Sequence, residues 1–382
     1  MDPALFSETK SGQLIPVQGI GDLKNAFVPD PLPPSWDWSE SLWPVLLEAR
    51  TALARLDGTG KHLPNPELLL KPMQNREAQR SSRLEGTITD PQQQALFQVD
   101  PKFPVSDSDP VNQYREVFNY SKALRMRLDG GSELPLSLRL IKDLHKTLMD
   151  GVRGSDKSPG EFRRTQNQVG RPARYVPPPM THLDDALDRF EKYLHSEPKY
   201  DPLVNAFLVH YQFEAIHPFG DGNGRVGRLL LAVTIAEWCA LANQWLYMST
   251  YFEQRRDEYL QRLLRVSTHG DWEGWVRFCL QGVIEQARDT ERRCEDLLKL
   301  NRDFHQRLQK IRGSVRLATI VDGLFEVPVI TVTQVQQRFV MTYPTARNDL
   351  RQLAQANIVS ELLNAGQITY YCKPIFDITY AD

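Results

Sequence analysis

The chain has 382 residues, of which 41% are hydrophobic and 25% charged, so it can build buried cores and is not globally disordered. Its 46 Lys and Arg residues and 48 Asp and Glu residues give a net charge of -2. This excludes a protein that binds nucleic acid over its entire surface. The length predicts roughly two or three domains. The chain starts without a basic or apolar signal region and has no stretch of about 18 apolar residues, so we expect a soluble protein that contacts no membrane. Four widely spaced cysteines without a CxxC pair are typical of thiols in the cytoplasm, where we expect the protein to reside.

The first region is expected over residues 1–109. Up to about residue 43 it is rich in proline and turn residues, which predicts an extended arm laid over the body. Helical spacing follows over 42–56 and 64–86. A stretch of Pro and Asp over 100–110 separates this region from a longer helical series.

The second region, residues 110–311, is a series of expected helices at 110–128, 137–150, 181–196, 201–216, 224–242, 253–267 and 272–311. Residues 159–179 interrupt this series, because their Pro and Gly residues exclude a helix and allow a short β-hairpin. The second region therefore predicts a helical bundle with one hairpin.

The third region, residues 312–382, has a different pattern. It predicts three helices, the first at 315–325, the second from Thr331 or Thr333 to 339 and the third at 344–356. Two strands follow at 357–362 and 367–373, joined by a turn at 364–366. This is the layout of a winged helix. Its six basic and six acidic side chains cancel, so duplex binding is possible but not favoured, and protein contact or dimerisation fits at least as well.

The segment 216–228 gathers groups that suit a polyphosphate. Its small residues lead into a helix whose free backbone N–H groups and dipole form an anion site. Arg225 and Arg228 are three residues apart and can add forked donors from one side of the first turn. Asp221 offers a hard oxygen to a magnesium ion. His217 is a base whose unperturbed pKa lies near working pH.

At this segment the sequence resembles the Fic family. Residues 217–228, His-Pro-Phe-Gly-Asp-Gly-Asn-Gly-Arg-Val-Gly-Arg, match the family pattern HPFx(D/E)GNGRxxR at every specified position. The resemblance extends over about 110–290, including 159–170 and 251–259, and residues 81–86, Ser-Ser-Arg-Leu-Glu-Gly, resemble the family's inhibitory motif (S/T)xxxE(G/N). It implies a mainly α fold, a Fic-type helical bundle with a β-hairpin flap, joined to a small α+β winged-helix domain.

The resemblance also implies an enzyme that transfers AMP from ATP, with Mg²⁺, to a Tyr, Thr or Ser hydroxyl of a target protein and releases pyrophosphate. His217 would take the proton from the hydroxyl as it attacks the α-phosphorus. Asp221, with Asn223, would hold Mg²⁺ on the α- and β-phosphates. The ATP-binding residues would be Gly222, Asn223, Gly224, Arg225, Val226, Gly227 and Arg228, with Tyr259 as a candidate for the adenine pocket.

Regulation and docking are implied outside that motif. Ser81 and Glu85 lie four apart on one helix face, and Glu85 would pair with Arg228 in place of the γ-phosphate. Around Gln168, Val169 and Gly170 the flap would offer a strand edge to an extended target loop.

Two other functions remain open. The first is a DNA-binding regulator whose helical body senses a nucleotide. The second is removal of AMP from a modified protein by the same site. Self-modification is expected of the transferase, and a homodimer is possible.

Overall fold

The computed structural model describes residues 2–17, 24–61, 66–128, 134–152, 158–170, 173–311, 314–362 and 368–381. Its helices are α1 (Trp43–Lys61), α2 (Glu67–Leu84), α3 (Pro91–Val99), α4 (Val111–Leu128), α5 (Leu138–Leu148), α6 (Met180–Leu194), α7 (Pro202–Ile216), α8 (Asn223–Trp238), α9 (Ser249–Gln254), α10 (Arg256–His269), α11 (Trp272–Lys310), α12 (Val315–Glu326), α13 (Val332–Arg338), α14 (Tyr343–Gln355) and α15 (Lys373–Tyr380). The strands are β1 (Gly12–Pro16), β2 (Asn25–Pro29), β3 (Val329–Thr331), β4 (Ser360–Leu362) and β5 (Thr369–Tyr371). Short 3₁₀ helices lie at Pro3–Phe6 and Glu40–Leu42. The predicted mainly α fold is confirmed.

The central helix α7 explains where the core sits. All of its residues except Pro202 and Glu214 are buried, which is typical of a helix apolar on every side. Asp201 caps its start by accepting from the Leu203 N–H at 2.9 Å. Helix α7 packs along α8 and also touches α6 and α11. The turn between α7 and α8 is therefore fixed by two buried helices.

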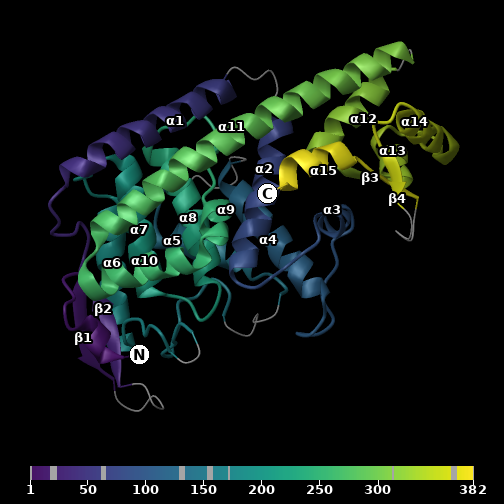
Figure 1. Ribbon diagram of the computed structural model, residues 1–382. Helices are drawn as coiled ribbons and strands as arrows, with labels where there is room; N and C mark the ends of the chain where they lie inside the picture. Colours follow the sequence, from purple (N-terminus) through teal and green to yellow (C-terminus); the bar gives the residue numbers. More distant parts are fainter. Residues whose placement is uncertain are drawn as a thin grey trace.

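Helix α11 connects the two ends of the molecule. Its 39 residues correspond to about 58 Å of α-helix. Figure 1 shows it running diagonally from the helical body, where α1 lies along it, to the C-terminal elements α12 to α15. The long helix predicted over 272–311 is thus a single element that connects the helical body to the C-terminal elements α12 to α15.

The N-terminal arm is more ordered than an extended strap. β1 and β2 form an antiparallel sheet in the register Gly12↔Pro29 to Pro16↔Asn25. Phe27 of β2 is fully buried and its ring meets those of Phe6 and Tyr175. The sheet is stabilised by the packing of Phe27 against residues far away in the sequence. The proline content of the arm does not reveal this packing, so the sequence predicted only an extended arm.

Three further elements were not predicted, α3, β3 and α15. Asp90 caps α3 through the Gln93 N–H, and Pro91 occupies its first position, so a start signal was present in the sequence. Helix α15 also has a proline near its start, and it packs back against α2, α3 and α11. Expected helix 253–267 corresponds to α10, and the short helix α9 precedes it and overlaps the expected range only at residues 253–254.

The C-terminal elements follow the order α12–β3–α13–α14–β4–β5, with the antiparallel strand order β3–β5–β4. The three helices and two strands keep the predicted order, with β3 added between α12 and α13. Thr331 caps α13 in a capping box with Gln334. The predicted turn at 364–366 lies outside the described residues. No described helix is both long and apolar enough to cross a lipid bilayer.

Candidate active site

His217 lies at the junction of α7 and α8. Its N–H donates to the Phe213 carbonyl at 2.9 Å, and its φ of +50° is left-handed, which is uncommon for a residue with a side chain. The buried Arg163 fastens this conformation, because its Nε donates to the His217 carbonyl at 3.1 Å and its N–H to the Pro218 carbonyl at 2.8 Å. A strained backbone held by surrounding contacts is typical of a functional position.

The contacts of the His217 imidazole indicate which of its two nitrogens carries the proton. Its Nδ1 lies 3.3 Å from the Glu214 carbonyl, which can only accept, so Nδ1 carries the proton and Nε2 keeps a lone pair. Burial lowers the pKa of His217 to about 4. The ring is therefore neutral near pH 7 and can accept a proton at Nε2.

The loop after α7 is fastened to the core by aromatic and amide side chains. Phe219 is fully buried and stacks on the His145 ring with centroids 3.8 Å apart. Asn223 accepts from the Phe219 N–H at 2.8 Å and donates to its carbonyl at 2.9 Å. His145 lies between the Asp221 carbonyl, at 3.1 Å, and the Gly160 N–H, at 2.9 Å. These contacts fix the loop before any ligand arrives.

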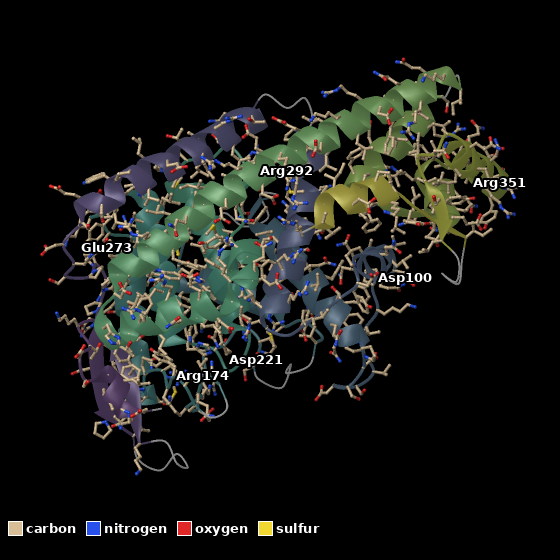
Figure 2. The ribbon with its side chains drawn as sticks, viewed as in Figure 1. Asp100, Arg174, Asp221, Glu273, Arg292 and Arg351 are labelled. Atoms are coloured by element: carbon tan, nitrogen blue, oxygen red, sulfur yellow. The ribbon has the colours of Figure 1, made fainter. Side chains whose placement is uncertain are left out.

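The first turn of α8 is the place where the sequence predicts an anion site. Gly222 adopts a φ of +75° directly before the helix, which lets the backbone turn into it. The helix N-terminus then offers unpaired N–H groups and the positive end of its dipole. A polar cavity of about 210 Å³ opens here, lined by Glu85, Thr87, Glu116, Asp221, Gly222 and Arg225. Figure 2 labels Asp221 on the lower side of the helical body.

Arg228 is paired with the C-terminal end of α2. Its side chain is 3% exposed and donates from Nη2 to Glu85 Oε1 at 2.8 Å and to the Ser81 carbonyl at 2.9 Å, and from Nε to Ser81 Oγ at 2.8 Å. Although burial would raise the pKa of Glu85, the adjacent guanidinium holds it below its usual value. A Cβ on Gly224 would lie 2.1 Å from Glu85 Oε1, so this carboxylate lies directly against the helix start. Ser81 therefore contacts the arginine through both its hydroxyl and its carbonyl.

A second and larger cavity of about 730 Å³ adjoins His217. Its apolar lining comes largely from α10, the flap and the N-terminal segment, namely Leu5, Val169, Ala173, Leu260, Leu263 and Leu264. Polar groups line it as well, among them Glu214, Gln261 and Ser267. Arg174, also at its wall, is labelled in Figure 2 on the same lower side as Asp221. An apolar pocket with a few polar groups beside an anion site can hold a small molecule with a phosphate tail.

Tyr259 does not line this cavity. Its ring is 3% exposed and stacks on Phe252 at 4.4 Å, and its hydroxyl lies 2.9 Å from His210 Nε2. The structure therefore places Tyr259 in the core behind α8. Its neighbour Leu260, one residue on, reaches the cavity instead.

The flap residues lie beside the large cavity. Val169 and Tyr175 form one antiparallel bridge, with the Val169 N–H donating to the Tyr175 carbonyl at 2.8 Å. The Val169 carbonyl also accepts from the Arg174 N–H at 2.9 Å, so both main-chain groups of Val169 bond within the hairpin, and the exposed Gln168 and Gly170 flank it at its outer edge. Gly170 has a φ of +84°. Gln168 is exposed at this edge and donates to the Gly170 carbonyl at 3.2 Å.

The residues fit one magnesium ion bound with a polyphosphate. Within the described part of the chain, no group of three His, Cys, Asp or Glu side chains could hold a metal by itself. Asp221 offers a carboxylate at the wall of the polar cavity, and Mg²⁺ commonly takes one or two carboxylates and completes its shell with phosphates and water. Asn223 is turned into the loop, where both ends of its amide are engaged by Phe219.

Sequence reasoning missed four residues of this site, His145, Arg163, Glu116 and Glu214. Arg163 belongs to the run 159–170 that resembles the family, and that membership was its only signal. The other three reach the site from α5, α4 and the buried end of α7, so only the packing of the helices brings them there.

Comparisons with known families agree with this geometry. Residues 135–235 match the family described as Fic/DOC family, and residues 43–129 match the one described as Fic/DOC family N-terminal. A relative from Drosophila willistoni, named protein adenylyltransferase Fic, is 27% identical over 238 residues, which are 58% of this chain and 44% of the relative. The protein of the same name from Drosophila grimshawi is 32% identical over 183 residues, which are 45% of this chain and 34% of the relative. The chain thus spans less than half the length of these relatives.

Solved structures share the fold. A Fic family protein from Desulfovibrio desulfuricans G20 has a TM-score of 0.57 at 19% identity and covers 89% of this chain and 98% of its own. A fragment of Fic-1 from C. elegans has a TM-score of 0.52 at 20% identity and covers 65% of this chain and 73% of its own.

Proposed function

The chain belongs to the Fic/DOC family, and on this premise we propose that it transfers AMP from ATP to a Tyr, Thr or Ser hydroxyl of a target protein. One observation carries the proposal most directly. The neutral His217 keeps an unprotonated Nε2 beside both a helix N-terminus suited to phosphate and a cavity of about 730 Å³. A base, an anion site and a ligand pocket then meet at one point.

In the proposed reaction, the target hydroxyl oxygen attacks the α-phosphorus of ATP in line with the leaving pyrophosphate. His217 Nε2 takes the hydroxyl proton as the new O–P bond forms and the bond to the β-phosphate oxygen breaks. The contacts of Arg163 hold the backbone of His217, so the ring approaches from a fixed direction.

The phosphates would lie along the start of α8. The N–H groups after Gly222 would stabilise the negative charge that develops on the phosphate oxygens. Arg225 would contact the β-phosphate region, and Arg228 the γ-phosphate. When bound, Mg²⁺ would neutralise charge on the α- and β-phosphates, with Asp221 as its ligand from the protein. Asn223 is left out of this metal site because its amide holds Phe219.

The large cavity is the proposed place for adenosine. Its leucines on α10 would contact the base, and its polar wall would face the ribose. Tyr259 is then a supporting core residue behind the pocket. The N-terminal segment closes the far side, because Leu5 lines the cavity and Thr9 Oγ1 donates to the Ser267 carbonyl at 2.6 Å.

We infer that Glu85 inhibits the enzyme in this conformation. Its carboxylate occupies Arg228 at 2.8 Å, where the γ-phosphate would bind, so ATP could not place its α-phosphorus in line. The typical coupling between such competing groups changes affinity by roughly 5 to 150-fold. Glu85→Gly is therefore expected to raise AMP transfer and self-modification by more than about tenfold.

The outward edge at Gln168 and Gly170 supports docking of an extended target segment by main-chain hydrogen bonds. Such docking would orient a hydroxyl without demanding much sequence. The C-terminal winged helix is proposed to act in assembly or target choice.

The experiment incubates purified Glu85→Gly protein with labelled ATP, Mg²⁺ and a cell extract, and identifies the labelled proteins and residues by mass spectrometry. Adding His217→Ala is expected to abolish labelling while ATP binding, measured by calorimetry, survives. Full labelling by the double variant would contradict the assigned base. Presenting the labelled target to the unmodified chain measures removal of AMP, the reverse use of the same site.

A further inference from the structure

We propose that Glu116 is a positioning residue that joins the phosphate-binding Arg225 to the segment following the inhibitory Glu85. The proposal rests on the proposed AMP transfer. Glu116 lies on α4, outside both sequence motifs, and its side chain is 2% exposed. Its Oε2 accepts from Arg225 Nη1 at 3.2 Å and from Thr87 Oγ1 at 2.6 Å.

Arg225 depends on this contact for its orientation. It is a buried arginine whose Nε has no hydrogen-bond partner among the described residues. Its Nη2 lies 3.9 Å from Asp221 Oδ1, which is too long for a hydrogen bond. A guanidinium recognises phosphate through a planar fork, so its plane must be set in advance. The hydrogen bond that Arg225 Nη1 donates to Glu116 Oε2 sets that plane at the wall of the polar cavity.

Thr87 makes the second connection. It is buried two residues after Glu85, and its N–H donates to the Ser82 carbonyl at 3.0 Å as the chain leaves α2. Its hydroxyl ties this turn to the same oxygen of Glu116 that receives Arg225. Glu116 therefore has two separable effects, one on the affinity for ATP through Arg225 and one on the placement of Glu85 through Thr87.

The effect on ATP is tested with Glu116→Gln in the Glu85→Gly background, where inhibition is removed. The amide keeps the shape but not the charge that holds a buried guanidinium. We expect the KM for ATP, and its Kd by calorimetry, to rise roughly tenfold, which is the usual worth of a hydrogen bond to a charged group. The kcat should change by less than about threefold, because His217 and the helix N-terminus are untouched.

Glu291→Gln is a matched control. Glu291 also accepts from an arginine and a threonine, Arg55 Nε at 2.8 Å and Thr59 Oγ1 at 3.3 Å, but it joins α11 to α1 away from the site. Glu116→Gln should lower the thermal unfolding temperature more than Glu291→Gln, because Arg55 is largely exposed whereas Arg225 is buried. Only Glu116→Gln should weaken ATP binding. Equal ATP affinity in the two variants would overturn the proposal.

The effect on inhibition is tested with Thr87→Val, which has nearly the same shape and lacks the hydroxyl. In the chain with Glu85 it should raise AMP transfer several-fold, and this gain should require Glu85, because the Glu85→Gly background has no inhibitory carboxylate left to release. No gain with Glu85 present would overturn this half of the proposal.

Two further outcomes separate the proposal from its alternatives. If Glu116→Gln at saturating ATP raises the Mg²⁺ concentration needed for half-maximal rate, Glu116 is a metal ligand and the positioning role is wrong. If the Glu85→Gly protein transfers no AMP, the proposed function fails, whereas the calorimetric Kd for ATP still decides the role of Glu116.

Discussion

Burial gives His217 its chemistry. A histidine in water would be partly charged near pH 6.5, but here burial lowers the pKa to about 4, so the ring is neutral across the physiological range. The Glu214 carbonyl holds the proton on Nδ1. In the proposed reaction the base is therefore ready in this conformation, and the proposed inhibition would act on the position of the substrate instead.

The pH dependence of the reaction should report this pKa. A base that must be unprotonated loses activity as the pH falls through its pKa, so kcat/KM of the Glu85→Gly variant should stay level from about pH 7 to pH 5. It should fall only as the pH approaches 4. Removing Glu85 moves the pKa further down, because its negative charge raises the pKa of His217. Single-turnover rates across pH test this, and a midpoint near 6.5 would contradict it.

Ser81 should contribute to inhibition through Arg228. Its hydroxyl accepts from Nε at 2.8 Å, and its carbonyl accepts separately from Nη2. Ser81→Ala removes one of these acceptors and leaves a buried donor unpaired, which loosens the arginine from α2. We expect AMP transfer to rise by about three- to tenfold, less than in Glu85→Gly, since one such bond is worth about 1 kcal/mol. Rates of self-modification measure it, and an unchanged rate would mean that Glu85 alone holds the arginine.

Helix α2 is an unusual element because much of its polar sequence is buried. Glu77 accepts from Tyr120 Oη at 2.9 Å, from Ser249 Oγ at 2.5 Å and from the Ser249 N–H at 3.2 Å. These partners lie on α4 and α9, so their hydrogen bonds hold the helix that ends at Glu85 against the helical body. Buried polar contacts of this kind specify one position for a helix.

Glu77 should make stability depend on pH in a defined direction. Burial raises its pKa to about 7, above its value of about 4.3 in an unfolded chain. The folded state then binds more protons between these values, so the free energy of unfolding falls as the pH rises from about 4.5 to 7. Glu77→Gln removes this titration. Any cost of its amide against the Ser249 N–H is the same at every pH.

The difference in thermal unfolding temperature between pH 5 and pH 8 should therefore be smaller in Glu77→Gln than in the unmodified chain. Calorimetry or circular dichroism measures it. Lys373→Gln, which removes a charge from an exposed i,i+4 pair on α15, is the control and should leave the difference unchanged. An equal difference in all three proteins would contradict a raised pKa at Glu77.

The parts that sequence reasoning predicted are those determined within a few residues. The turn 217–228 carries its chemistry in adjacent positions, and the order α12, α13, α14 follows from caps and prolines nearby. The sheet β1–β2 and the site residue Glu116 depend on partners far along the chain, 29 residues away for Thr87 and 109 for Arg225. Patterns over a few residues do not reveal such distant contacts. Tyr259 shows a different limit, because its place in the sequence is next to a pocket residue but its side chain packs in the core.

The C-terminal elements lie against α2, the helix that ends at Glu85, as well as beside the body. Helices α12 and α15 both pack on α2, and α15 also reaches α11, where Arg293 Nη2 donates to the Ala381 carbonyl at 2.7 Å. Figure 1 shows α2 between the helical body and these elements, with α15 alongside. A shift of α2 that withdraws Glu85 must therefore also disturb its contacts with α12 and α15. A partner bound to that domain could bias the inhibited state by the same coupling.

An ion pair at this contact offers a test. Lys71 Nζ of α2 lies 2.5 Å from Glu326 Oε1 of α12, and both side chains are partly exposed. Lys71→Glu places two carboxylates together and should loosen α2 from α12. Since a partly exposed pair is worth up to about 1 kcal/mol, AMP transfer should rise by no more than about fivefold. Adding Glu326→Lys exchanges the charges and should restore the original rate. In the Glu85→Gly background, Lys71→Glu should have no effect, because nothing is left to release. A gain that persists there, or that the charge exchange fails to reverse, would mean that the C-terminal elements do not act through α2 and Glu85.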